Sequence, residues 1–301
     1  MKLTTKNLII ILVVLAAALA VSQLTKRSGK SKSLRSDLVV LDTAKVSKIE
    51  IASTEGNVAL TSTAAGWVVD LEDGSQKRTR KDAVTNLLAS LNTIEPGRLA
   101  SKSPDKWKDY QVDSAGTRVR VYEGKEVATD IVLGRFGVEG QQSYYTFVRL
   151  FEDDEVYVAP NFMSITVSKD AASYRDNNVM RLQKDSLTSI TFNYPDSAFR
   201  LSKGDSWFLA DQPADSAAVA GYLNSLSFLT SRMFYDEPLA EDPSHTVSFS
   251  FSNQPDIVID AYLQGGETIV RSSENKNELF TDFPLVGKVF KGRSAFLTTS
   301  R

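Results

Sequence analysis

The chain contains no cysteine and a single histidine, His245. Without cysteine, disulfide bonds and thiolate metal sites are excluded. With one histidine, a side-chain metal site would need a cluster of carboxylates. A Ser-His-Asp triad could use only His245, which we expect in an exposed turn before a strand, and no G-x-S-x-G segment accompanies it. We therefore predict no catalytic residue, no cofactor and no metal site.

The sequence also lacks the glycine patterns that bind nucleoside phosphates and dinucleotides. Gly134–Gly137 follows an apolar run but has no third glycine and no helix after it, so we predict a turn there. Glu152–Glu155 is the densest acidic run, and we predict a hairpin turn between two strands. Loose calcium binding is the alternative for this run, although it lacks the spacing of a calcium loop.

Acidic residues are missing from residues 1–35, which hold seven of the 35 lysines and arginines. Subtracting these seven leaves 28 basic against 37 acidic residues in the rest of the chain, a net charge of −9. An acidic body repels phosphate backbones, so we predict that the protein does not bind nucleic acid. The basic cluster suits anionic lipid head groups instead.

Asn7–Thr25 is an uncharged stretch of 19 residues with basic residues on both sides. As a helix it would extend about 28 Å, close to the ~30 Å hydrocarbon core of a bilayer. We therefore predict a transmembrane anchor over residues 7–25. The alternative is a signal peptide cleaved after the A-x-A site Ala18–Ala20, which would release a soluble exported protein.

The flanking charges leave the orientation of this anchor open. Two basic residues precede the span and five follow it within residues 1–35, which favours a cytoplasmic body. However, large domains translocate largely regardless of charge, and a short tail before an anchor usually stays inside. We predict a single-pass protein of the bacterial inner (cytoplasmic) membrane with its body on the periplasmic side.

The pattern of one amphipathic helix occurs twice, about 135 residues apart. Apolar residues at i, i+3, i+4 and i+7 are Val84, Leu87, Leu88 and Leu91 in the first case, and Val219, Tyr222, Leu223 and Leu226 in the second. A repeat of this length indicates one module used twice. We expect Thr79 to cap the first helix in a capping box with Asp82, and Asp215 to cap the second.

Strand patterns surround both helices in the same order. They are residues 49–51, 58–60, 67–71, 119–121, 131–133, 145–147 and 156–158 in the first copy, and 190–194, 199–201, 207–209, 247–251, 257–259, 268–270 and 279–280 in the second. Pro160 and Pro284 are each expected to open a short helix after the last strand. The offset between copies shrinks along the chain, which indicates that the second copy has shorter loops.

Strand groups joined by tight turns favour antiparallel pairing, and alternating polar residues fit a sheet with one covered face. The predicted fold class is α+β: an N-terminal transmembrane helix followed by two tandem, duplicated antiparallel-sheet-plus-helix modules. The expected boundaries are a tail at 1–6, the anchor at 7–25, a basic linker at 26–36, a first module at 37–182 and a second module at 183–301.

An ordered series of short motifs runs through the first copy. It comprises Val46, Ile49 and Ile51, then Gly66-Trp67, Ser90-Leu91, Val132-Leu133-Gly134, Tyr144-Tyr145 with Val148, Val156–Val158, and Tyr174-Arg175-Asp176. With the N-terminal anchor, this series resembles the DUF4340 family of bacterial membrane-anchored proteins of unknown function. The resemblance is strongest over residues 40–182 and weaker over the second copy. It implies no catalytic residues.

The same resemblance implies an accessory role near a membrane complex. Members of that family often lie beside genes for an ABC-type transport system related to gliding motility. The expected partners are therefore the membrane, through residues 7–25, and envelope proteins that include components of an ABC-type transport system.

Tyr174, Arg175 and Asp176 are the candidate residues for a structural or partner contact. An arginine can bridge a carboxylate through two hydrogen bonds and can stack on a tyrosine ring. We predict a clasp that joins the first copy to the second, with a contact for a partner protein as the alternative.

These patterns favour a non-enzymatic, membrane-anchored accessory or interaction protein of the cell envelope. One alternative is an envelope hydrolase that uses carboxylates, since sequence separation does not give the distance between acids. The other is a soluble exported ligand-binding protein formed by signal-peptide cleavage.

Overall fold

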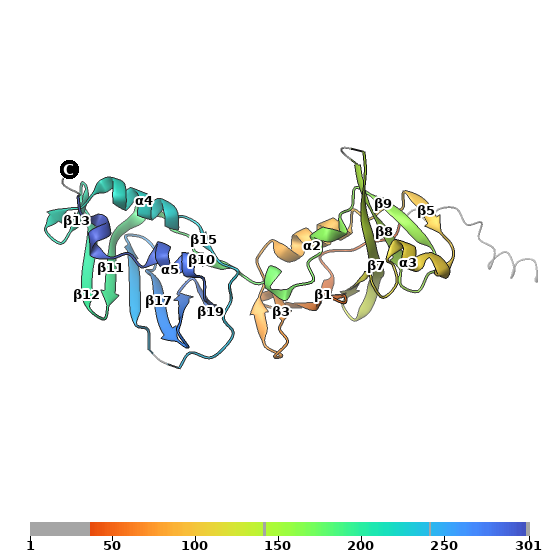
Figure 1. The fold of residues 1–301 in the computed structure, drawn as a ribbon, viewed down its shortest axis with the longest axis horizontal. Coiled ribbons are helices and arrows are strands. Elements are labelled where there is room, and N and C mark those ends of the chain that lie inside the picture. Colours follow the sequence, from red (N-terminus) through yellow and green to blue (C-terminus); the bar gives the residue numbers. More distant parts are fainter. Residues whose placement is uncertain (1–36, 141–142, 241, 299–301) are drawn as a thin grey trace, which may run out of the picture.

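The computed structural model describes residues 37–140, 143–240 and 242–298. Large antiparallel sheets with few helices make up these residues, in two lobes placed end to end (Figure 1). The predicted tail, anchor and linker at residues 1–36 lie outside the described residues. Within the described ranges, no helix is both long enough and apolar enough to cross a bilayer.

The first sheet has nine strands in the order β4-β3-β2-β1-β6-β7-β8-β9-β5. In that order they are Gln76–Arg78, Gly66–Asp70, Asn57–Thr63, Val46–Ala52, Thr117–Glu123, Glu126–Glu139, Ser143–Leu150, Val156–Pro160 and Arg98–Ser101. Every pairing is antiparallel. Alternation along the strands directs Ile49, Ile51 and Leu60 to one face, where they are buried.

The second sheet has eight strands in the order β14-β13-β12-β11-β16-β17-β18-β19. In that order they are Gln212–Pro213, Trp207–Leu209, Ser197–Lys203, Leu187–Tyr194, His245–Phe251, Ile257–Gln264, Glu267–Ser272 and Asn275–Phe280. A separate two-stranded ladder pairs β10 (Asn178–Met180) with β15 (Leu229–Thr230). Apart from β5, the two large sheets have the same strand order.

Equivalent backbone hydrogen bonds extend this correspondence beyond strand order. The amide of Arg80 donates to the carbonyl of Tyr174 at 2.9 Å, and the amide of Asp215 donates to that of Phe296 at the same distance. Likewise Thr79 donates to Trp67 at 3.0 Å, and Ala214 to Trp207 at 2.9 Å. In each module, one of these bonds joins the segment before the main helix to the end of the module, and the other joins it to β3 or β13.

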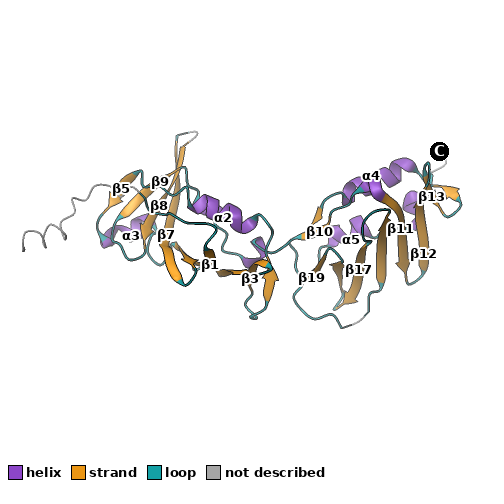
Figure 2. Cartoon of the chain, turned by 180° about the vertical axis from the view of Figure 1, so that it is seen from behind, coloured by secondary structure: helices purple, strands orange, loops and turns teal. Residues whose placement is uncertain are grey.

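One helix covers each sheet, α2 (Ala83–Leu91) in the first module and α4 (Ser216–Leu226) in the second, and both lie on the same side of the molecule (Figure 2). The predicted apolar stripe of each helix is buried. Burying one such side chain contributes roughly 1.5–3 kcal/mol, so the stripe fixes the helix to the sheet. Smaller helices are α3 (Trp107–Tyr110) and α5 (Phe283–Val289).

The two helix starts differ, and one prediction about them was wrong. The carboxylate of Asp215 accepts hydrogen bonds from the amides of Ala217 and Ala218, which confirms it as the cap of α4. Thr79 does not cap α2; Asp82 takes that position without a side-chain hydrogen bond. Thr79 instead forms a β-bridge with Arg175, so its amide belongs to the sheet edge rather than the helix.

The two prolines also behave differently. Pro284 lies in the first turn of α5, as predicted. Pro160 is the last residue of β9, and only a 3-10 turn at Ser164–Thr166 follows it, so the helix expected there does not form. Phe162 is nevertheless buried, which ties this segment to the first core without helical geometry.

Each module has its own main core of buried apolar residues. The second core begins with Val179 and Met180, upstream of the boundary expected after residue 182. This placement follows from β10, whose pairing with β15 commits residues 178–180 to the second module. The chain thus crosses between the modules at Arg175–Asn177.

Candidate functional site

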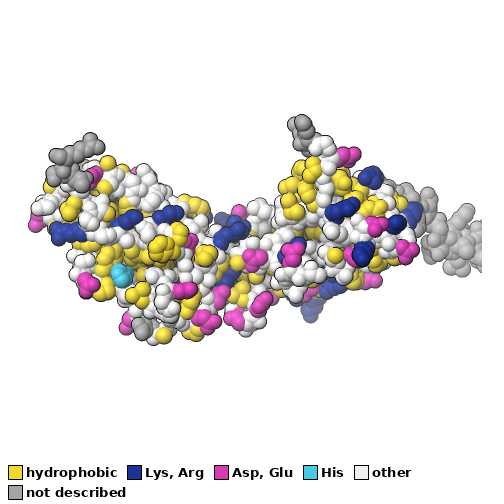
Figure 3. Space-filling model, viewed as in Figure 1, with side chains coloured by type: hydrophobic (Ala, Val, Ile, Leu, Met, Phe, Trp, Pro, Cys, Tyr) yellow, Lys and Arg dark blue, Asp and Glu magenta, His cyan; other side chains and the backbone are white. Residues whose placement is uncertain are grey.

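The two modules meet where the edge strand β4 lies beside the edge strand β19. The ammonium group of Lys77, on β4, donates a 2.9 Å hydrogen bond to the carbonyl of Asn277 on β19. Figure 3 shows Lys or Arg side chains gathered at this waist with acidic side chains beside them. The junction also contains Arg175, one of the three residues nominated from the sequence.

Arg175 lies at the centre of the junction and is almost fully buried. Its guanidinium donates to both carboxylate oxygens of Asp236, at 2.8 and 2.6 Å. It also donates to both oxygens of Glu278, one of them at 3.2 Å. The ring of Phe234 lies 3.9 Å from the guanidinium carbon, on one face of the plane. One guanidinium thus makes two bidentate ion pairs and stacks on a ring. These contacts together fix its orientation.

Glu278 has no solvent exposure, and a buried carboxylate is costly unless it is paired. Burial raises the pKa of Glu278 above the usual value for a glutamate, although hydrogen bonds from Arg175 and the charge of Lys77 oppose the shift. The ammonium of Lys77 lies 3.8 Å from Glu278 and 3.9 Å from Asp236. Two cations therefore face two carboxylates, which neutralises the buried charges.

The same pair of acids bears on the hydrolase alternative. Two carboxylates that act as acid and base need space between them for substrate or water. Asp236 and Glu278 both bind one guanidinium, which occupies that space. Chemically, this arrangement suits an ion-pair lock between two modules.

The neighbours of Arg175 in the sequence have different surroundings. Tyr174 packs in the first core, and its hydroxyl donates a 3.0 Å hydrogen bond to the carbonyl of Ser168. Burial raises the pKa of Tyr174, so the phenol is neutral at physiological pH. Asp176 accepts a 3.1 Å hydrogen bond from the amide of Asn178, and its carbonyl accepts one from the side chain of Asn275. Of the three residues, only Arg175 makes an ion pair between the modules among the described residues.

His245, the single histidine, is half-buried at the start of β16 rather than exposed in a turn, which corrects the expectation. Its Nδ1 lies 2.9 Å from the hydroxyl of Ser244, and that hydroxyl donates to the carbonyl of Ala261. The imidazole packs against the rings of Tyr194 and Phe290, with ring centroids 5.0 and 6.2 Å away. This environment explains the burial, because the ring packs into an aromatic cluster.

The two loop predictions had different outcomes. Glu152–Glu155 joins the antiparallel strands β8 and β9, so the hairpin turn is confirmed. Gly134–Gly137 is not a turn; it lies inside the long strand β7, at a register shift between Leu133 and Phe136. Glycine is required at 134 because an added Cβ would lie 2.6 Å from Val112 and still closer to the carbonyl of Tyr110. Across the described ranges, no group of three or more His, Asp or Glu residues is arranged to hold a metal ion.

Sequence reasoning identified Arg175 but none of its partners in the second module. A signal was present for Glu278, which shares the inward face of β19 with Phe280. An acid at an inward strand position indicates a buried partner. Asp236 and Lys77 carry no comparable signal, since their places depend on how the two modules meet.

The chain matches the model of the family described as "Domain of unknown function (DUF4340)" over residues 67–247, more than half of its length. The match starts within the first sheet and ends within the second, so it covers Arg175 and Asp236. No curated protein and no solved structure matches the chain significantly. The family match confirms the resemblance seen in the ordered motifs, and the chain belongs to the DUF4340 family.

Proposed function

We propose that this protein is a single-pass, membrane-anchored, non-enzymatic interaction protein of the bacterial cell envelope. Residues 7–25 would be the anchor in the inner membrane, and the two modules would lie on the periplasmic side. The repeated fold is the observation that carries the proposal. Matching strand orders and matching hydrogen bonds before each helix support a duplication of one module.

Comparison of equivalent residues supports a binding role rather than duplicated catalysis. Arg80, Tyr174 and Arg175 of the first module correspond to Asp215, Phe296 and Leu297 of the second, by their places in the matched hydrogen bonds. The backbone hydrogen bonds are the same in both modules, but the side chains at these three positions differ in polarity and charge. A pair of divergent modules on a fixed junction is suited to present two different surfaces to neighbouring proteins.

The partners we propose are envelope proteins, including components of an ABC-type transport system or a gliding-related complex. The test is photo-crosslinking in native membranes with identification of the captured neighbours. Crosslinkers at the exposed Phe283 and at the exposed Val138 would sample the second and first modules separately. Reproducible and different neighbours at the two positions would support the proposal; background capture at both would contradict it.

The proposed anchor needs a separate test, because a cleaved signal peptide would leave the body free. Intact mass of the mature protein and alkaline extraction of membranes distinguish the two cases. The proposal predicts a chain that retains residues 7–25 and stays in the membrane pellet. A mature chain that begins at Val21 and remains in the aqueous fraction would contradict the anchor.

A further inference from the structure

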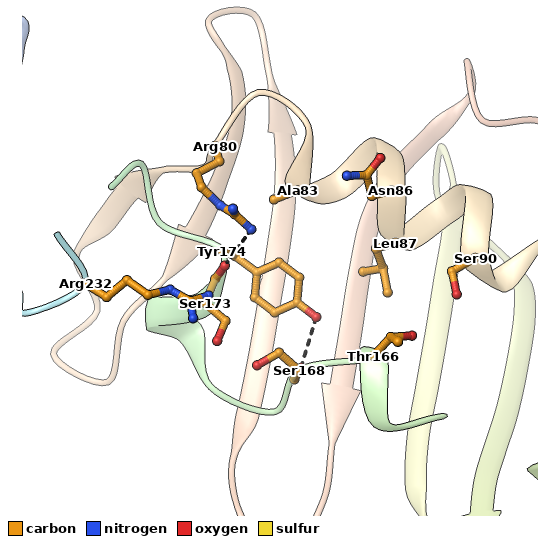
Figure 4. A pocket seen from close by; sticks show the side chains of 10 residues that line it. All are labelled: Arg80, Ala83, Asn86, Leu87, Ser90, Thr166, Ser168, Ser173, Tyr174 and Arg232. Carbon is orange, nitrogen blue, oxygen red and sulfur yellow. Dashed lines mark hydrogen bonds between the residues drawn. The ribbon is translucent and has the colours of Figure 1, made fainter. Parts of the chain in front are cut away.

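A pocket of about 380 Å³ lies beside helix α2, on the side where the second module approaches the first (Figure 4). The residues that line it are labelled in Figure 4. Nine of these residues belong to the first module, and Arg232 comes from the second. The lining thus combines two cations, several hydroxyl groups and an amide with an apolar wall, and it contains no acidic residue.

The two arginines of the pocket differ from Arg175 nearby, because neither has a carboxylate partner among the described residues. Arg80 donates one 3.3 Å hydrogen bond, from Nη2 to the carbonyl of Ser173. Its Nε is buried and has no acceptor within the described part of the chain. A buried donor without an acceptor costs about 1–3 kcal/mol, so an anion at this place would relieve a real penalty.

Arg232 supplies the second charge, from the second module. Figure 4 shows its side chain extending toward Ser173, on the same side of the pocket as Arg80. Two cations that line one pocket repel each other, and an anion bound between them would be attracted to both. Arginine is also the residue whose planar donors match carboxylate and phosphate oxygens best.

The second module carries different side chains at the equivalent positions. Tyr222 is equivalent to Leu87 by the 135-residue offset of the helices, and its ring packs 5.3 Å from Phe296. The hydroxyl of Tyr222 donates a 2.8 Å hydrogen bond to the carbonyl of Val289. Asp215 stands where the first module has Arg80, and its carboxylate caps α4. The first module therefore has a smaller side chain and a cation at positions that the second fills with a ring and an acid.

We propose that this pocket binds a small molecule through a carboxylate or phosphate oxyanion, held by Arg80 and Arg232. The amide of Asn86 lines the same space and supplies a further donor, while Leu87 and the ring of Tyr174 accept an apolar portion of the ligand. Because Arg80 and Arg232 belong to different modules, the bound anion also links the modules at a second point beside the Arg175 ion pairs.

The test is isothermal titration of the full-length chain in non-ionic detergent with inorganic phosphate and, in a separate arm, with butyrate. Ionic strength is kept constant with chloride. Saturable binding of either anion by the unmodified chain is expected, and the better ligand identifies the oxyanion. Arg232→Gln should weaken binding at least about tenfold, since it removes a charged hydrogen-bond donor.

Arg98→Gln is the matched control, because Arg98 is exposed on the edge strand β5 of the first module and does not line the pocket. Its affinity should stay within about twofold of that of the unmodified chain. Arg80→Gln should weaken binding as much as Arg232→Gln does, and circular dichroism checks that this variant is folded. If Arg80→Gln does not fold, the result for Arg232→Gln alone decides the test. The proposal is overturned if neither anion binds saturably, or if Arg98→Gln and Arg232→Gln weaken binding equally.

Discussion

At the residue scale, the junction depends on one guanidinium that serves two carboxylates. Arg175 is held by Asp236 and Glu278, and removal of the arginine would leave the fully buried Glu278 with only the more distant Lys77. Breaking a buried pair from one side costs more than the pair itself contributes, because an uncompensated charge remains. The ion pairs of Arg175 therefore stabilise the arrangement of the two modules at the junction.

Arg175→Gln should lower the free energy of unfolding by about 3–5 kcal/mol, the cost of leaving one partner of a buried ion pair. Urea denaturation followed by circular dichroism measures this change. The double variant Arg175→Gln/Glu278→Gln should recover part of the loss, because it also removes the buried negative charge. A single variant within about 0.5 kcal/mol of the unmodified chain would show that the ion pairs do not stabilise the fold.

The loss in Arg175→Gln should depend on pH. Burial already raises the pKa of Glu278, and without Arg175 the largest opposing influence is removed. A carboxyl whose pKa is raised in the folded state lowers the free energy of unfolding at pH values above that pKa, where the group is ionised. This loss of stability disappears as the pH falls toward the ordinary pKa of 4.5. The stability gap between variant and unmodified chain should thus be smaller at pH 5 than at pH 8. An equal gap at both pH values would contradict this assignment.

The sequence was informative about Arg175, but it did not show which acids pair with it, for a physical reason. The motif Tyr174-Arg175-Asp176 combines a ring, a cation and an acid, which is a local property that can be read along the chain. Asp236 and Glu278 lie 61 and 103 residues further on, and their approach depends on how two sheet edges meet. No local pattern specifies that meeting. The arginines of the pocket were missed for the same reason.

At the element scale, periodicity predicted fourteen strands and the two main helices, but it missed the short strands β4, β5, β10, β14 and β15. Short-range motifs were less reliable. Thr79 and Asp82 match a capping box, yet Thr79 pairs with Arg175 in a β-bridge. The pairing with Arg175, which is distant in the sequence, places Thr79 at the edge of the sheet instead of at the start of the helix. The same holds for Gly134–Gly137, where a strand with a register shift replaces the expected turn.

The two helix caps give a controlled comparison within one chain. Asp215→Ala should destabilise the protein by about 0.5–2 kcal/mol, because it removes an acceptor for the amides of Ala217 and Ala218. Asp82→Ala should change the stability much less, since Asp82 makes no side-chain cap hydrogen bond. Thermal unfolding of both variants measures the difference. Equal losses would show that the carboxylate of Asp215 does not act as a cap.

At the scale of the whole molecule, the sequence repeat indicated two modules, and the structure has two sheets of matching strand order. What the repeat could not indicate is the arrangement of the modules. In the structure, an edge strand of the first sheet meets the opposite edge of the second, so the modules follow one another head to tail (Figure 1). This arrangement creates the ion-paired junction, and with it the pocket to which both modules contribute.

Distance measurement between the modules tests most directly the claim that the junction joins them into one unit. The chain has no cysteine, so cysteines introduced at the exposed, equivalent positions Thr85 on α2 and Ala220 on α4 would carry the only spin labels. Pulsed electron paramagnetic resonance should give one narrow distance distribution for this labelled chain, and a broad one after Arg175→Gln. Arg98→Gln, as a control, should leave the distribution narrow. A broad distribution before any change at Arg175, or a narrow and unchanged one after it, would contradict the account.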